Sequence, residues 1–305
     1  MVAGQVARDL ALKVEQLPDE GSSADVVERL EMLGGAANQA VGCRQLGWSA
    51  GLVGVVGDDD AGRALLAAAG ADDLDIEGVR IRQGGTTALY VDVVEAGGAR
   101  RIFDHVPEEV LLTAADIVAA EPMLSAARAV LIQLQQPSEA VLAAIDIAAR
   151  GDALVVVDGF PEDSRVLETV LSSAHVIRAD AAEAPTLVGR ELSGVADTVA
   201  AAISLAADSS AVVALAAEGA ANVLAWQGGH VVLPLIPGTT VDATGGGDAF
   251  LAGLVSALLL GADPETAGWE ASAAAALTVG RLGGRPQLDA RRVSDLARES
   301  RREAT

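Results

Sequence analysis

Short apolar segments alternate with longer alanine- and leucine-rich segments along most of this chain. Six of the short segments are typical of β-strands, and several are apolar at every position, as strands buried on both faces of a parallel sheet are. They lie at 52–57, 129–134, 153–158, 174–179, 211–216 and 221–226. Segments between them, such as 137–151 with its terminal Gly151, have helical spacing. Repeated strand–helix–strand units predict an α/β fold with a mostly parallel sheet covered by helices on both faces.

Two further segments alternate apolar and polar residues at a period of two, which is typical of strands with one solvated face. They are residues 9–18 and 86–103, and the second contains a hairpin signal at Glu95–Gly98. We expect them to form a small, partly exposed sheet that stands off the main sheet.

Charge and residue usage exclude several classes of protein. The 305 residues carry a formal net charge of −22 and no basic run, which disfavours nucleic acid and anionic membranes as partners. Cys43 is the one cysteine, so no disulfide forms within the chain, and the longest apolar run, 249–262, is too short to cross a bilayer. Without a secretory signal pattern, we expect a cytoplasmic protein. Lys13, the one lysine, follows no glycine loop, which excludes P-loop and protein-kinase phosphate binding.

The segment TGGGDAF places Gly245, Gly246 and Gly247 directly before Asp248 and a long apolar stretch. Glycines at the start of a helix let backbone N–H groups approach an anion, and the helix end adds a partial positive charge. A carboxylate beside such an anion site has a purpose if it accepts the proton of an attacking hydroxyl group. The alternative interpretation is a flexible loop in which Asp248 is an ordinary helix N-cap.

Motifs spread over nearly the whole chain follow one known pattern. DATGGGD at 242–248 is similar to a D-T-x-G-A-G-D signature, and GGAANQAVGCRQLG at 34–47 to a G-G-x-x-N-x-A signature. Weaker similarities occur at VGDDDAGRALL (56–66), VIRADAAEAPTLVG (176–189) and LAAEGA (215–220). On these motifs the chain resembles the ribokinase family, also called the PfkB carbohydrate kinases.

The resemblance implies a ribokinase-like three-layer α/β sandwich, a single domain over residues 1–305 with a small β lid at about 9–33 and 84–106. It implies an ATP-dependent kinase that phosphorylates a hydroxyl group of a small carbohydrate. Asp248 would be the general base and Gly245–Gly247 the anion hole. The sugar would be bound by Asp9, Gly34, Gly35, Asn38 and Asp248. Because lids of this family often pair, we expect a homodimer through the lid.

The resemblance also implies nucleotide and metal sites. The nucleotide would contact Asp180, Glu183, Ala214, Ala216, Gly219 and Gly247. Glu183, with Asp180, would hold Mg²⁺ through water, and a potassium ion, which many family members use, would lie at Asp242, Thr244 and Gly283. Ala214 and Ala216 replace a threonine and a glycine of the family pattern, Asp180 replaces an asparagine, and Gln135 replaces a glutamate that often contacts the sugar. These departures spare the base and the anion hole but put ribose itself in doubt.

Two alternative functions stay open. A nucleoside kinase of the same family would need an aromatic stacking platform, for which Tyr90 and Phe103 are the candidates in the lid segment. The departures in the nucleotide site, Ala214, Ala216 and Asp180, keep a non-catalytic sugar- or nucleotide-binding protein open as the second alternative. Intact Asp248 argues against it, because a binding protein needs no base there.

Other local patterns have ordinary structural interpretations. GWSAG at 47–51 matches the nucleophile elbow of serine hydrolases, but its predicted strand follows the serine instead of preceding it. DDD at 58–60 predicts a solvated turn, and the resemblance implies that Asp58 caps the next helix. Arg100 and Arg101 either meet an anionic group on the substrate or, as we favour, solvate the lid. The three histidines show no metal-ligand spacing.

Overall fold

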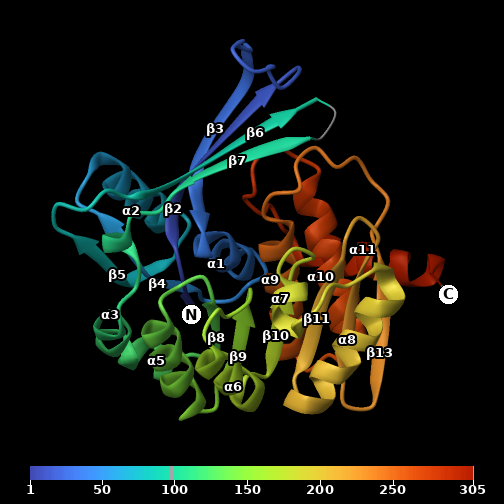
Figure 1. Cartoon of the computed structure of the whole chain (residues 1–305). Helices are drawn as coiled ribbons and strands as arrows, with labels where there is room; N and C mark the ends of the chain where they lie inside the picture. The colour runs from blue at the N-terminus through green and yellow to red at the C-terminus, as the bar shows by residue number, and fades with distance from the viewer. Residues whose placement is uncertain (97–98, 305) are drawn as a thin grey trace.

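The computed structural model describes residues 1–96 and 99–304, which form a large and a small sheet with helices around the large one (Figure 1). The strands are β1 (Val2–Ala3), β2 (Val6–Val14), β3 (Val26–Gly35), β4 (Gly51–Gly57), β5 (Asp75–Arg82), β6 (Ala88–Glu95), β7 (Arg100–His105), β8 (Ala129–Gln133), β9 (Leu154–Asp158), β10 (Val176–Ala179), β11 (Val212–Ala217), β12 (Ala221–Trp226) and β13 (Gly229–Pro234). The α-helices are α1 (Ala36–Gln45), α2 (Asp60–Ala71), α3 (Ala114–Ala119), α4 (Glu121–Ser125), α5 (Ser138–Ala149), α6 (Ser164–Ser173), α7 (Ala184–Val188), α8 (Gly194–Ser209), α9 (Gly246–Leu259), α10 (Pro264–Val279) and α11 (Ala290–Glu303), and one 3₁₀ helix spans Glu108–Val110.

The large sheet confirms the mostly parallel arrangement that the sequence predicts. Within the described residues its strand order is β13-β12-β11-β10-β9-β8-β1-β4-β5. Neighbouring strands from β5 to β11 run parallel, whereas β12 and β13 add antiparallel strands at one edge. The six predicted strands correspond to β4 and β8–β12, while β1, β5 and β13 were not predicted.

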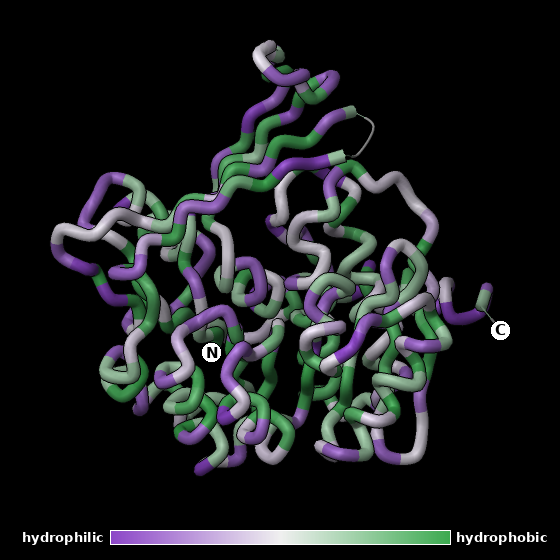
Figure 2. Tube along the Cα trace, viewed as in Figure 1, coloured by the Kyte–Doolittle hydropathy of each residue, from purple (hydrophilic) through white to green (hydrophobic). Residues whose placement is uncertain are grey.

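Alternation along the central strands produces the three layers. Val155 and Val157 of β9 belong to a buried cluster that includes residues of α3, α5 and α8. Val156, between them, belongs to the opposite cluster, which includes residues of α1, α9 and α10. Apolar segments accordingly fill the body of the molecule (Figure 2). Strands that are apolar at every position are therefore buried on both faces, as predicted.

The small sheet has the order β3-β2-β6-β7 and stands over the body (Figure 1). Strand β2 pairs antiparallel with β3 and parallel with β6, and β6 pairs antiparallel with β7. The pairing of β6 with β7 agrees with the predicted hairpin, although its Gly97 and Gly98 lie outside the described residues. The predicted second sheet is confirmed.

The chain crosses between the two sheets twice within its first 36 residues. It leaves β1 through Gly4 and Gln5 to enter β2, and it returns from β3 at Gly35, the residue before α1. Gly35 has φ 65°, and a Cβ atom there would overlap the carbonyl oxygen of Gln5, so only glycine fits. The two crossings bring Asp9 of β2 and Asn38 of α1 to the junction of the sheets.

Two local predictions have different outcomes. Asp59, not Asp58, caps α2, because Asp59 Oδ1 accepts a hydrogen bond from the N–H of Gly62 at 2.7 Å. Asp58 instead forms an exposed ion pair with Arg63 at 3.4 Å, so the predicted cap was wrong by one residue. Ser49 lies between α1 and β4, which confirms that GWSAG has no strand before its serine. No helix in residues 1–96 and 99–304 is long and apolar enough to span a membrane.

Candidate active site

Asp248 lies in the first turn of α9, two residues after its first residue, Gly246. Gly245 is the N-cap residue, with φ 70°, so the alternative of Asp248 as the N-cap is wrong. A Cβ atom on Gly245 would overlap the carbonyl oxygen of Gly284, which only glycine avoids. The glycine loop is thus packed against the segment around Gly284, and the carboxylate follows it on the helix.

A chain of hydrogen bonds holds the Asp248 carboxylate. Oδ1 accepts from Gln39 Nε2 at 3.0 Å, and Oδ2 accepts from Asn38 Nδ2 at 3.4 Å. The same Gln39 Nε2 donates to Asp158 Oδ2 at 2.8 Å, and Asp158 Oδ1 pairs with Arg178 Nη1 at 2.7 Å. Gln39 is 0% exposed and Asp158 6%, so this network is fixed in the interior.

Sequence reasoning missed three members of this network: Gln39, Asp158 and Arg178. One signal was available, because Arg178 is a charged residue within a mostly apolar predicted strand. Its guanidinium group lies against the glycine loop, since a Cβ atom on Gly247 would overlap Arg178 Nη2. The loop therefore has a fixed positive charge beside it.

The surroundings of Asp248 suit a proton acceptor. Burial and, to a lesser extent, the charge of Asp158 raise the pKa of Asp248, whereas Gln39, Arg178 and Asn38 lower it, and the net result is a pKa of about 7. A general base works best when its pKa is close to the operating pH. Burial also raises the pKa of Asp9 to about 7, with the charge of Asp248 as the second cause. Asp9 and Asp248 are thus close enough for the charge of Asp248 to raise the pKa of Asp9.

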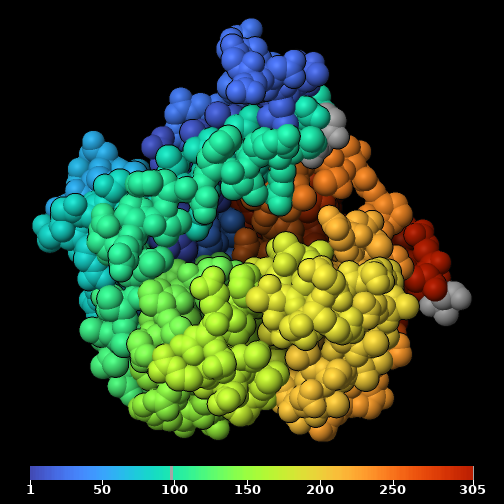
Figure 3. Space-filling model, viewed as in Figure 1, coloured from blue at the N-terminus to red at the C-terminus, as the bar shows by residue number. Residues whose placement is uncertain are grey.

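One large cavity joins most of the predicted site residues. It has a volume of about 1110 Å³ and opens as a hollow between the small sheet and the body (Figure 3). This volume is at the upper end for single-ligand pockets, which leaves room for two reactants side by side. The predicted residues that line it are Asp9, Gly35, Asn38, Asp180, Glu183, Ala216, Gly219, Thr244, Gly245, Gly247, Asp248 and Gly283.

The remaining predicted residues lie behind the cavity wall. Gly34 makes room for Asp9, because a Cβ atom at 34 would overlap the Asp9 carboxylate. At Gly246 a Cβ atom would come within 2.8 Å of a methyl carbon of Val279. Ala214 is 2% exposed within β11, so it is a core residue and not part of the cavity lining.

Asp180 and Glu183 border the cavity at the end of β10. Glu183 Oε2 accepts from the N–H of Asp180 at 2.9 Å, and its Oε1 accepts from Gln135 Nε2 at 2.7 Å. Asp180 Oδ1 accepts from the N–H of Glu183 at 2.9 Å. Burial raises the pKa of Glu183. Two carboxylates beside a phosphate site fit Mg²⁺, which proteins bind through one or two carboxylates, with phosphates and water completing the shell.

Asp242 and Thr244 connect the glycine loop to other parts of the chain. Asp242 is 2% exposed, and its oxygens accept from the N–H groups of Thr244 at 2.9 Å and Gly283 at 2.8 Å. The Thr244 hydroxyl donates to Asp92 of β6 and accepts from Arg100 Nη1 of β7 at 3.0 Å. Its side chain is therefore committed to the small sheet.

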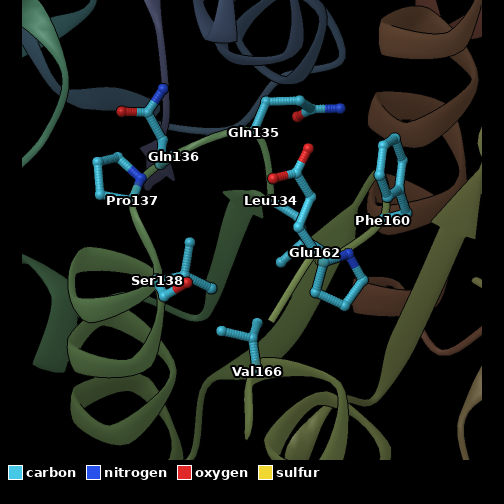
Figure 4. Close-up of a pocket in the computed structure, with 10 residues that line it drawn as sticks. Leu134, Gln135, Gln136, Pro137, Ser138, Phe160, Glu162 and Val166 are labelled. Atoms are coloured by element: carbon cyan, nitrogen blue, oxygen red, sulfur yellow. The ribbon is translucent and has the colours of Figure 1, made fainter. Parts of the chain in front are cut away.

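A second cavity of about 320 Å³ adjoins the first, because Gln135 and Gln136 line both. Figure 4 shows its other walls, which include Phe160, Glu162 and Val166. Among the described residues that line this second cavity, none has a buried polar side-chain atom without a partner. We assign no ligand to it.

A proton acceptor, an anion-binding helix start and two carboxylates in one cavity define a phosphotransferase-type site. The sequence model described as "pfkB family carbohydrate kinase" matches residues 1–291. The chain belongs to this family, whose members are phosphotransferases with a hydroxyl group as acceptor.

Named relatives and solved structures agree with this assignment. The ATP-dependent ribose-1-phosphate kinase of Halopiger xanaduensis is 32% identical, over 94% of this chain and 95% of the relative. The ribokinase of Haemophilus influenzae is 26% identical, over 95% of each chain. The structure of Arabidopsis thaliana ribokinase complexed with ribose and ATP superposes with a TM-score of 0.78 over 97% of each chain, at 24% identity, which shows a ribokinase-like fold.

Proposed function

We propose that this protein transfers the γ-phosphoryl group of ATP to a hydroxyl group of a small carbohydrate. The observation that carries the proposal is the Asp248 carboxylate, with a pKa of about 7, in the first helical turn after the glycine loop. Asp248 accepts the proton of the substrate hydroxyl, the freed oxygen bonds to the γ-phosphorus, and the bond to the β-phosphate oxygen breaks to release ADP. The protein's task is then mainly positioning and charge stabilisation.

Two features of the chain stabilise the negative charge that develops on the transferred phosphoryl group. The N–H groups at the start of α9 point towards the anion site, as at any helix N-terminus. Arg178 lies against Gly247 and is held by Asp158, so its charge requires no rearrangement during the reaction. Mg²⁺, held by Glu183 and Asp180 through water, would neutralise phosphate charge. A potassium ion would be held by Asp242 and by backbone carbonyl groups such as that of Gly283.

The structure weakens both alternatives. Phe103, one of the two candidate stacking residues for a nucleoside, is 61% exposed and does not line the cavity, although Tyr90 does. The binding-protein alternative rested partly on the loss of a threonine at Ala214, but Ala214 is a core residue. Asp248 and its network would serve no purpose in a protein that only binds.

ADP release with ATP and Mg²⁺ tests the proposal across sugars, sugar phosphates, polyols and nucleosides. We expect turnover with a carbohydrate and a loss of at least about 10²-fold in Asp248→Asn. Asp208→Asn, an exposed carboxylate on α8, is the matched control and should leave the rate unchanged. Turnover that survives in Asp248→Asn, or the absence of turnover with every acceptor, would contradict the proposal.

We further propose that the small sheet, residues 9–33 and 84–106, acts as a lid and pairs with a second copy in the cytoplasm. Its edge strands β3 and β7 expose apolar side chains, including Val27 at 54% and Phe103 at 61%. Pairing would cover these edges. Light scattering should show a dimer that Phe103→Asp converts to a monomer, and a monomeric wild-type protein would contradict this part.

A further inference from the structure

Three side chains join the small sheet to the glycine loop. Thr244, the residue before the N-cap Gly245, donates its hydroxyl hydrogen to Asp92 Oδ2 of β6 across a separation of 152 residues. The Thr244 hydroxyl oxygen accepts from Arg100 Nη1 of β7 at 3.0 Å, and this nitrogen lies 3.9 Å from Asp92 Oδ2. We call Thr244, Asp92 and Arg100 the bridge. The bridge attaches the loop to a second sheet that is remote in the sequence.

The bridge lies directly beside the start of α9. The Thr244 N–H group donates to Asp242 Oδ1 at 2.9 Å, but Asp242 belongs to the same segment of the chain, so this bond restrains the loop only locally. Gly245 follows with φ 70°, and its conformation sets the direction of the N–H groups at the helix start. A displacement of about 1 Å at such a site can lower a rate by about 10²-fold. The position of Thr244 therefore matters for the anion site.

Apolar contacts dock the small sheet on the body independently of the bridge. Leu282 packs against Ala11 of β2 and Val94 of β6 in a cluster separate from the two large ones. Met32 of β3 lies against Gly283, because a Cβ atom at position 283 would overlap Met32 Cε. None of these contacts uses a side chain of the bridge, so they should keep the small sheet in place when the bridge is removed.

Packing does not explain a carboxylate at position 92. Asp92 is 7% exposed, and its Oδ1 has no hydrogen-bond partner among the described residues. Its register partners on the neighbouring strands, Ala11 and Ile102, are apolar. Burying a carboxylate oxygen without a partner destabilises the folded state. An apolar residue would therefore suit the fold better, and the carboxylate is explained by its bond to Thr244.

We propose that Asp92 is a positioning residue for phosphoryl transfer, which acts through the Thr244 hydroxyl to hold the glycine loop in the shape that stabilises the transferred group. Arg100 completes the bridge by donating to the same hydroxyl oxygen. The inference rests on the proposed kinase function and goes beyond it, because Asp92 needs to touch neither reactant. An anion site that is held in place before the reaction requires no reorganisation when charge develops.

A double-mutant cycle tests the bond between the two side chains. Asp92→Leu and Thr244→Val keep the shapes of the side chains and remove the bond, so each should lower kcat by about tenfold and change KM for the acceptor by less than about twofold. Because both variants break the same bond, the double variant should also lose about tenfold, whereas independent effects would multiply to about 100-fold and would overturn the inference. Thr240→Val, at an exposed position shortly before the loop, is the matched control and should keep the full rate.

Two further variants and measurements distinguish positioning from support of the fold. Asp92→Asn keeps an oxygen that can accept from the Thr244 hydroxyl, so it should recover kcat to within about threefold of wild type. Asp92→Leu should unfold at the same or a higher urea concentration than wild type, because it removes an unpaired buried oxygen. A variant that is slower and also clearly less stable would show that Asp92 supports the fold, and the assignment would fail.

Binding of a transition-state mimic measures the anion site without turnover. Calorimetric titration with ADP, Mg²⁺ and aluminium fluoride in the presence of the preferred sugar should show about tenfold weaker binding in Asp92→Leu, with binding of ADP alone unchanged. Equal weakening of both would contradict a role in the anion site. A wild-type protein that phosphorylates no acceptor would refute the kinase function and this inference with it. An active wild-type protein with an equally active Asp92→Leu variant would refute the inference alone.

Discussion

Replacing Asp248 by asparagine should make the protein inactive and more stable. Burial raises the pKa of Asp248 from its ordinary value of 3.8 to about 7. The folded state therefore binds this proton more tightly than the unfolded state, and the resulting stabilisation is lost as pH rises through 7. At about 1.4 kcal/mol for each pKa unit, holding the charged carboxylate in the folded protein costs up to about 4 kcal/mol at pH 8. Asparagine carries no charge and avoids this cost.

Urea unfolding over a range of pH measures this effect. Asp248→Asn should raise the free energy of unfolding at pH 8 by up to about 4 kcal/mol, and the gain should shrink by about 1.4 kcal/mol for each pH unit below 7. Asp208→Asn, at an exposed position, should stay close to wild type throughout. A less stable Asp248→Asn protein, or a gain that does not depend on pH, would refute the reasoning.

Three further predictions concern the same site. Gln39→Met removes a hydrogen-bond donor to Asp248 and should raise the pKa of this carboxyl group, so the acid limb of the profile of kcat/KM against pH should move to higher pH by about one unit. Asp158→Asn removes a neighbouring negative charge and should move the same limb to lower pH. Shifts in the same direction would contradict the network. Gly245→Ala should lower kcat by at least about 10²-fold, because the added Cβ atom overlaps the backbone of Gly284. Gly228 also has a positive φ but lies in open space, so Gly228→Ala is the control and should keep full activity in the same assay. Removal of Mg²⁺ with a chelator should abolish ADP release, and added Mg²⁺ should restore it; activity that persists would contradict the metal's role.

Periodicity predicted a mostly parallel sheet and a separate small sheet, whereas the ribokinase-like sandwich was implied by the family resemblance. Strands that are apolar throughout indicated burial on two faces, and the alternating segments indicated the small sheet. The strand β1 escaped prediction because it has only two residues, too few for any period to show. The family resemblance assigned the cap of α2 one residue early. Three consecutive aspartates give the same local signal, so the sequence offered no correction, and only Asp59 also reaches Thr87.

The site was predictable where its residues lie in one motif and not where contacts between distant segments create it. Asp248 and the glycines are adjacent in the sequence, so this one motif was sufficient to predict an anion site beside a proton acceptor. Gln39 meets Asp158 over a separation of 119 residues, and Asp92 meets Thr244 over 152. Nothing near Asp158 or Asp92 in the sequence indicates these partners. A motif can also mislead. Ala214 was predicted to contact the nucleotide from its place in the motif, but the motif does not reveal which side chains of the strand face the cavity, and Ala214 lies in the core.

The order of the layers along the chain has a consequence for synthesis. The helices α3–α8, which cover one face of the large sheet, precede residue 210, whereas α9–α11 begin only at Gly246. While the chain emerges from the ribosome, α1 and α2 cover part of the second face of the sheet, but the rest stays bare until the last 60 residues arrive, which exposes apolar side chains to aggregation. The same residues deliver Asp248, so completion of the hydrophobic interior and acquisition of the catalytic base are one event. A nascent or truncated chain that lacks α9 therefore has neither a closed interior nor a base with which to phosphorylate a substrate.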